Sequence, residues 1–128
     1  MFQKMGTRSK LCQNHIALAE AYVKKGELEK AEDQCMKGLE IALEVPYPFD
    51  EAKIQSILGE IASRTNGNAE EHFLKSMDIF SSLGRKYELA LAMEKYGQMK
   101  MDKGQTKEGE KYVGDAAKIF KELGVDGY

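Results

Sequence analysis

The chain has 128 residues, and its 19 Lys and Arg against 21 Asp and Glu give a formal net charge of -2. This balance leaves no cationic surplus to neutralise a phosphate backbone, which argues against general nucleic-acid binding. No apolar run approaches the roughly 20 residues that cross a bilayer, and the first residues hold no apolar stretch typical of a signal peptide. We therefore expect one cytoplasmic domain with neither a nucleic acid nor a membrane as its partner.

The residue pattern favours helices joined by short loops along the whole chain. Apolar residues recur at helical spacing, whereas β-branched residues are scarce and no segment alternates apolar and polar residues as a strand would. The two cysteines, Cys12 and Cys35, lie within these helical patterns and do not form a CxxC motif. The sequence predicts an all-α fold with no β-sheet.

A period of 39 to 40 residues divides the chain into similar units. A phenylalanine followed four positions later by glycine occurs at Phe2, Phe80 and Phe120, and the last two are 40 residues apart. Ile41–Pro46 occupies the corresponding position one period after the first of these segments, with Pro46 in place of the glycine. In chain order, the period predicts the end of a preceding helix at 1–8, a first repeat at 9–46, a second at 48–84, a third at 86–124 and a tail at 125–128.

Each unit is predicted to be an antiparallel pair of closely packed helices. A small residue recurs in the first helix and another in the second, so the two helices can approach while larger neighbours fill the flanking grooves. Gly26 and Gly104 suit the left-handed conformation at a helix end, and Asn68 with Glu71 is typical of a helix N-cap. The facing small residues are Ala19 with Ala31, Gly59 with Ala69, and Gly97 with Gly109.

These positions resemble those of the tetratricopeptide repeat family. The first repeat carries Leu18-Ala19, Tyr22, Gly26 and Ala31, and the third carries Tyr96-Gly97, Gly104, Gly109 and Ala116. The second repeat departs from the family at a shorter inner turn and at Ala62, where the family prefers an aromatic residue. The resemblance, to the longer-period repeats of bacterial regulatory proteins, implies a right-handed superhelix (an α-solenoid) of three helix pairs.

Residues that could carry catalysis or bind a metal are few. His15 and His72 do not belong to clusters of ligand-type residues with metal-site spacing, so packing explains both better than metal binding. Nothing marks Cys12 or Cys35 as a nucleophile, and no glycine-rich phosphate-binding loop is present. The sequence therefore predicts that the chain is not an enzyme and uses neither a cofactor nor a metal.

In a superhelix of this kind, the first helix of each pair lines the concave groove, where a partner would bind. Glu20, Glu60 and Glu94 then form an acidic ladder that favours a basic or amphipathic helical partner, unless they are only solvated helix surface. The family's carboxylate-binding set of Lys, Asn and Arg is not present. The predicted groove residues are Gln13, Ile16, Glu20, Lys53, Ser56, Glu60, Glu94, Gln98 and Met101.

The fold and the absence of catalytic motifs favour a protein–protein interaction module that holds a peptide or helix of another protein in this groove. One alternative is an oligomerisation scaffold that associates through repeat ends lacking a polar cap, of which the α-helical face carrying Val113 and Phe120 is an example. A second alternative is a peptide-sensing segment of a larger bacterial regulator.

Overall fold

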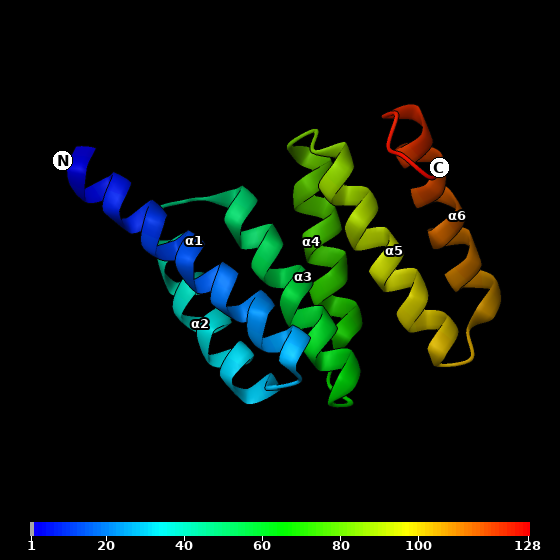
Figure 1. Ribbon diagram of the computed structural model, residues 1–128, viewed down its shortest axis with the longest axis horizontal. Helices are drawn as coiled ribbons and strands as arrows, with labels where there is room; N and C mark the ends of the chain where they lie inside the picture. Colours follow the sequence, from blue (N-terminus) through cyan, green and yellow to red (C-terminus); the bar gives the residue numbers. More distant parts are fainter. Residues whose placement is uncertain (1) are drawn as a thin grey trace.

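The computed structural model describes residues 2–128, with side chains from residue 6 onward, and shows helices that follow one another in a single stack (Figure 1). Over these residues the chain contains no strand, which confirms the all-α prediction. The helices are α1 (Phe2–Lys25), α2 (Leu28–Glu44), α3 (Pro48–Arg64), α4 (Ala69–Ser82), α5 (Lys86–Asp102) and α6 (Thr106–Glu122).

Consecutive helices form three antiparallel pairs, α1 with α2, α3 with α4, and α5 with α6. In the second pair, the Ser76 hydroxyl donates to the carbonyl of Ala52 at 2.8 Å, while Gly59, farther along α3, faces the earlier residue Phe73. The pairs correspond in order to the three predicted repeats, although the first pair begins at Phe2 rather than at residue 9, and they succeed one another along the long axis, as in a solenoid (Figure 1). The right hand of the superhelix stays a prediction.

The turns contain the residues that such turns require. Gly26, Gly84 and Gly104 have φ angles of 78°, 69° and 88°, in the left-handed region that a side chain would strain. The Asn68 side chain accepts a hydrogen bond from the backbone N–H of Glu71, as expected of an N-cap. These residues account for every turn except the one between α2 and α3, and only two to four residues separate consecutive helices.

The predicted close approach of helices is clearest in the third pair. A Cβ atom on Gly97 would lie 2.7 Å from the carbonyl oxygen of Gly109, and one on Gly109 would lie 2.5 Å from the carbonyl oxygen of Gly97. In the second pair, a Cβ atom on Gly59 would lie 2.9 Å from the ring of Phe73, which is one turn beyond Ala69 on α4. Gly59 therefore makes room for an aromatic ring, a role that the small-residue pattern alone does not indicate.

The hydrophobic core continues from each pair into the next. One cluster joins the first pair to α3 through Ile54, Ile57 and Ile61, and another joins α3 and α4 to α5 through Phe73 and Tyr96. Because these residues are buried between neighbouring pairs, the stack has a fixed arrangement that positions the first helices relative to one another.

Two expectations about the chain ends differ from the structure. The segment 1–8 does not form the end of a separate helix: α1 is continuous from Phe2, and Gly6 lacks the positive φ of Gly84 (Met1 lies outside the described residues). The expected uncapped apolar face of α6 is also covered at Phe120, which is buried beneath Tyr128 with ring centroids 4.6 Å apart. Gly124 and Gly127, with φ angles of 75° and 89°, turn the tail back over this ring.

Candidate functional site

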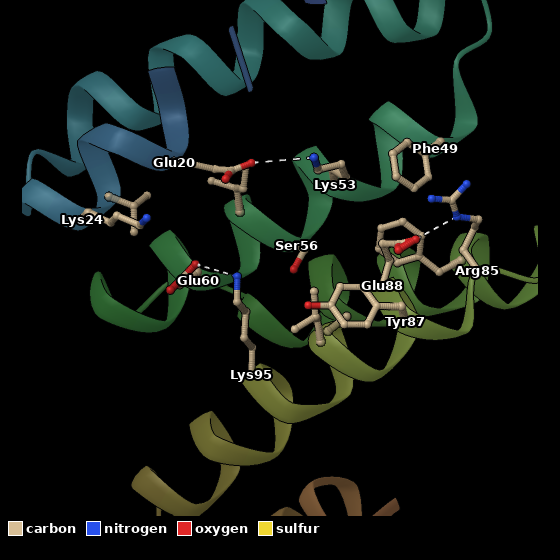
Figure 2. A pocket seen from close by; sticks show the side chains of 15 residues that line it. Glu20, Lys24, Phe49, Lys53, Ser56, Glu60, Arg85, Tyr87, Glu88 and Lys95 are labelled. Atoms are coloured by element: carbon tan, nitrogen blue, oxygen red, sulfur yellow. Dashed lines mark hydrogen bonds and ion pairs between the residues drawn. The ribbon is translucent and has the colours of Figure 1, made fainter. Parts of the chain in front are cut away.

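A groove with a volume of about 550 Å³ lies along the first helices of the three pairs (Figure 2). Its lining comes from α1, α3 and α5, with Phe80 contributed by α4 and Arg85 by the turn between α4 and α5. Stacking of the pairs places these helices side by side, so residues distant in sequence meet here. The groove lies along the same first helices from which the sequence predicted a binding surface.

Aromatic side chains form the apolar part of the groove at its end near the α4–α5 turn. Phe49 packs edge-on against Phe80 with ring centroids 5.8 Å apart, and Tyr87 packs in the same way against Phe120 at 5.7 Å. Tyr87 is 47% exposed and lies across the groove in Figure 2. An exposed aromatic ring in a concave site is well suited to bury an apolar side chain of a partner.

Ion pairs cross the groove between neighbouring first helices (Figure 2). Glu20 of α1 lies 4.0 Å from Lys53 of α3, and Glu60 of α3 lies 3.5 Å from Lys95 of α5. Glu60 also pairs with Arg64 at 3.6 Å. Two of the three glutamates of the predicted acidic ladder therefore have cationic partners within the chain. Their charges are balanced, so they give no reason to expect a basic ligand.

The charge balance of the groove is opposite in sign to that of the whole chain. Four cationic side chains line the groove against three anionic ones, whereas the chain as a whole carries -2. The surplus is local, and it favours anionic groups on a bound partner. The cations are Lys24, Lys53, Arg85 and Lys95, and the anions are Glu20, Glu60 and Glu88.

The structure brings together four of the nine predicted groove residues: Glu20, Lys53, Ser56 and Glu60 all line the groove. Gln13 and Gln98 do not line it, and the Gln98 side chain donates to Asp102 on its own helix.

The other three predicted residues have partners elsewhere in the fold. Ile16 is 3% exposed and belongs to the core between the first two pairs. Met101 lies against Gly109 inside the third pair, so its predicted orientation toward the groove is wrong. Glu94 accepts a hydrogen bond from the Tyr128 hydroxyl at 2.8 Å.

Sequence reasoning missed the aromatic residues and Arg85. A signal for the aromatics was present, because Phe49 and Tyr87 are 38 residues apart while Phe80 and Phe120 are 40 apart. The two edge-on pairs therefore repeat with the period of the helix pairs. Arg85 has no such signal, because it lies in the turn before α5 rather than on a helix.

A second pocket of about 390 Å³ adjoins the groove where α2 leads into α3. Phe49 and Arg85 line both cavities, so they stand at the junction between them. Asp50 is the one carboxylate among the residues that line this second pocket; it is 7% exposed, and burial raises the pKa of its carboxyl group. The remaining lining residues are Pro46, Tyr47, Pro48 and Leu83.

A separate polar cluster surrounds Lys100, away from the groove. The Lys100 ammonium lies 2.9 Å from Glu108 and 3.6 Å from Glu70, and the Tyr96 hydroxyl donates to Glu70 at 2.6 Å. The hydrogen bond with Glu108 raises the pKa of Lys100, and burial raises that of Tyr96 to about 12. Both groups keep their protons at neutral pH, so the cluster ties α4, α5 and α6 together rather than providing a base.

Neither cysteine is activated. Burial raises the pKa of the Cys12 thiol to about 11 and that of the Cys35 thiol to about 12, so both remain protonated at neutral pH. In the part of the chain that the structure describes, no group of three or more His, Cys, Asp or Glu side chains is arranged to hold a metal ion. Within the same residues, none of the helices is sufficiently long and apolar to cross a membrane.

In comparisons with family models, with curated proteins and with solved structures, the chain has no match.

Proposed function

We propose that the chain is a non-catalytic, tetratricopeptide-like recognition module of the cytoplasm, which binds a segment of another protein in the groove along α1, α3 and α5. The observation that carries this proposal is the groove itself, about 550 Å³ in volume and lined by side chains from three successive helix pairs. Concave surfaces of stacked helix pairs offer many side chains to an elongated ligand at the same time.

The composition of the groove supports a protein segment as the ligand. Tyr87 and Phe49 offer aromatic surface, and charged side chains of both signs surround them. Protein-binding sites combine an apolar centre with a polar rim in this manner, with aromatic residues enriched at the centre. The buried contacts between pairs fix the helices before binding, which lowers the ordering cost of association.

Selection of random linear peptides on the purified chain tests the proposal, with binding of the enriched peptides then measured on variants. Tyr87→Ala removes the exposed ring of the groove, and we expect it to weaken binding by roughly tenfold or more. Leu74→Ala is the matched control, because Leu74 is 45% exposed against 47% for Tyr87 but lies on α4 outside the groove.

Circular dichroism and thermal unfolding establish that each variant is folded at the temperature of the binding measurement. If Tyr87→Ala is not folded, Lys53→Glu reverses a partly exposed charge of the same groove and serves in its place. Enriched peptides that bind all variants equally well would contradict the proposal, as would the absence of any enriched peptide.

A further inference from the structure

Arg85 is held in a fixed orientation at the junction of the two cavities. Its guanidinium carbon lies 4.4 Å from the ring centroid of Phe49, and its Nε atom donates to Glu88 at 2.8 Å. In Figure 2 the two terminal nitrogens point away from Glu88. Within the described residues these two nitrogens have no hydrogen-bond or ion-pair partner.

This arrangement leaves the end of the guanidinium group available to a ligand. Two parallel N–H donors in one plane match the two oxygens of a carboxylate, which a lysine ammonium cannot do with the same geometry. Because Phe49 and Glu88 already orient the group, less side-chain entropy is lost when a ligand binds.

The surroundings of Arg85 favour an anion. The Lys53 ammonium lies 5.7 Å from the centroid of the same Phe49 ring, so one aromatic side chain has two cations beside it. The helices α3 and α5 both begin here, and their N-terminal ends carry partial positive charge. The carboxylates near these cations are Glu88, which pairs with Arg85, Glu20, which pairs with Lys53 at 4.0 Å, and Asp50, which is buried.

An apolar slot lies directly beside this cationic position. The second pocket, about 390 Å³ in volume, is lined by Tyr47, Pro48 and Leu83, with Arg85 and Phe49 at its junction with the groove. A chain segment that follows the groove past Arg85 therefore reaches a cavity large enough for an apolar side chain.

We propose that Arg85 binds the carboxylate of an Asp or Glu side chain in the segment held by the groove, and that a neighbouring apolar side chain of that segment enters the second pocket. This inference rests on the proposed function, since it names the chemistry of the same ligand. It makes Arg85 the residue that determines ligand specificity, in place of the acidic ladder that the sequence suggested.

The test uses the groove-dependent peptides selected above, each compared with its Asp→Asn or Glu→Gln derivative. With the natural chain, we expect loss of the one critical carboxylate to weaken binding by about tenfold. Arg85→Lys keeps the charge but not the planar donors. With this variant, the parent peptide should bind about tenfold more weakly, whereas the affinity of the derivative should change little. Phe49→Leu, which removes the ring beneath the guanidinium, should act in the same direction.

Lys86→Gln is the matched control, because it removes a cation adjacent in sequence that lines neither cavity. It should leave the affinity of every peptide within about twofold. Groove-dependent peptides that lack acidic residues, or whose affinity Arg85→Lys leaves unchanged, would overturn this inference while the proposed function stands. Peptides whose binding is insensitive to Tyr87→Ala would overturn both.

Discussion

The imidazole of His15 in α1 is hydrogen-bonded to the side chain of Gln34 in α2, with Nδ1 and Oε1 2.6 Å apart. The second pair contains the same bond with its ends exchanged: Gln55 of α3 follows His15 by 40 residues, and its Oε1 lies 2.7 Å from Nδ1 of His72 on α4. In both pairs an imidazole N–H donates to a carboxamide oxygen, whichever of the two helices carries the histidine. Both histidines are therefore structural residues that link the two helices of a pair.

His72 is expected to make stability depend on pH. Burial lowers the pKa of His72 below its ordinary value of 6.5, so the unfolded chain binds this proton more readily than the folded one. Protonation of His72 therefore favours the unfolded chain. The free energy of unfolding should be highest above pH 6.5 and should decrease as the pH falls below that value. Urea unfolding of the natural chain should show this decline, and His72→Gln should show less of it. Equal pH dependence of the two proteins would contradict the assignment.

The contact between α5 and α6 should not tolerate one extra carbon atom. In Gly97→Ala the new Cβ would lie 2.7 Å from the Gly109 carbonyl oxygen and 2.9 Å from Val113, so helix α5 or α6 must shift. We expect a loss of about 1–3 kcal/mol in the free energy of unfolding. Gly114→Ala is the control: no atom lies within 4 Å of its Cβ, and better helix propensity should stabilise the chain by about 0.5–1 kcal/mol. Similar effects of both variants in urea unfolding would refute this packing.

Removing the acids around Lys100 should destabilise the protein more than removing the lysine. The Lys100 side chain is only 8% exposed, while Glu70 and Glu108 reach solvent. Loss of both carboxylates leaves a buried ammonium without an ionic partner, whereas Lys100→Met leaves two solvated acids. Thermal unfolding should therefore give a lower melting temperature for Glu70→Gln with Glu108→Gln than for Lys100→Met. The reverse order would show that the ammonium is solvated.

The tail should stabilise α6 mainly through the ring of Tyr128. Tyr128→Ala uncovers Phe120, and amide hydrogen exchange in the last turns of α6 should become faster. Tyr128→Phe keeps the ring and removes only the hydrogen bond to Glu94, so it should leave most of the protection in place. Equal exchange in the natural chain and Tyr128→Ala would mean that the Tyr128 ring contributes nothing to this end of the stack.

The sequence predicted the three helix pairs because their boundaries depend on local residues. Gly84 and Gly104 end helices by their conformation, and Asn68 begins one through its side chain, so neither effect needs knowledge of tertiary contacts. Gly6 shows the limit of this reasoning. It occupies the same place in the repeated segment, yet the residues after it continue as helix and α1 passes through it.

The site was predicted less completely because groove residues depend on how neighbouring pairs pack. Ile16 is close to Glu20 along the helix, but it faces the core shared with α3 while Glu20 faces the groove. Helical periodicity shows that both residues lie on one side of the helix, but it does not show which of them is in the core and which is in the groove. Arg85 lies outside any helix, so helical periodicity gives no indication of it. Only the structure shows that its guanidinium group lies against Phe49.

The two ion pairs that cross the groove, Glu20 with Lys53 and Glu60 with Lys95, make the groove side of the stack sensitive to ionic strength. Each joins one helix pair to the next through partly exposed side chains, so each contributes at most about 1 kcal/mol and is weakened by salt. The buried apolar contacts between the pairs are not screened in this way. Concentrated salt should therefore weaken the contacts on the groove side of the stack, while the buried apolar contacts keep the helix pairs together.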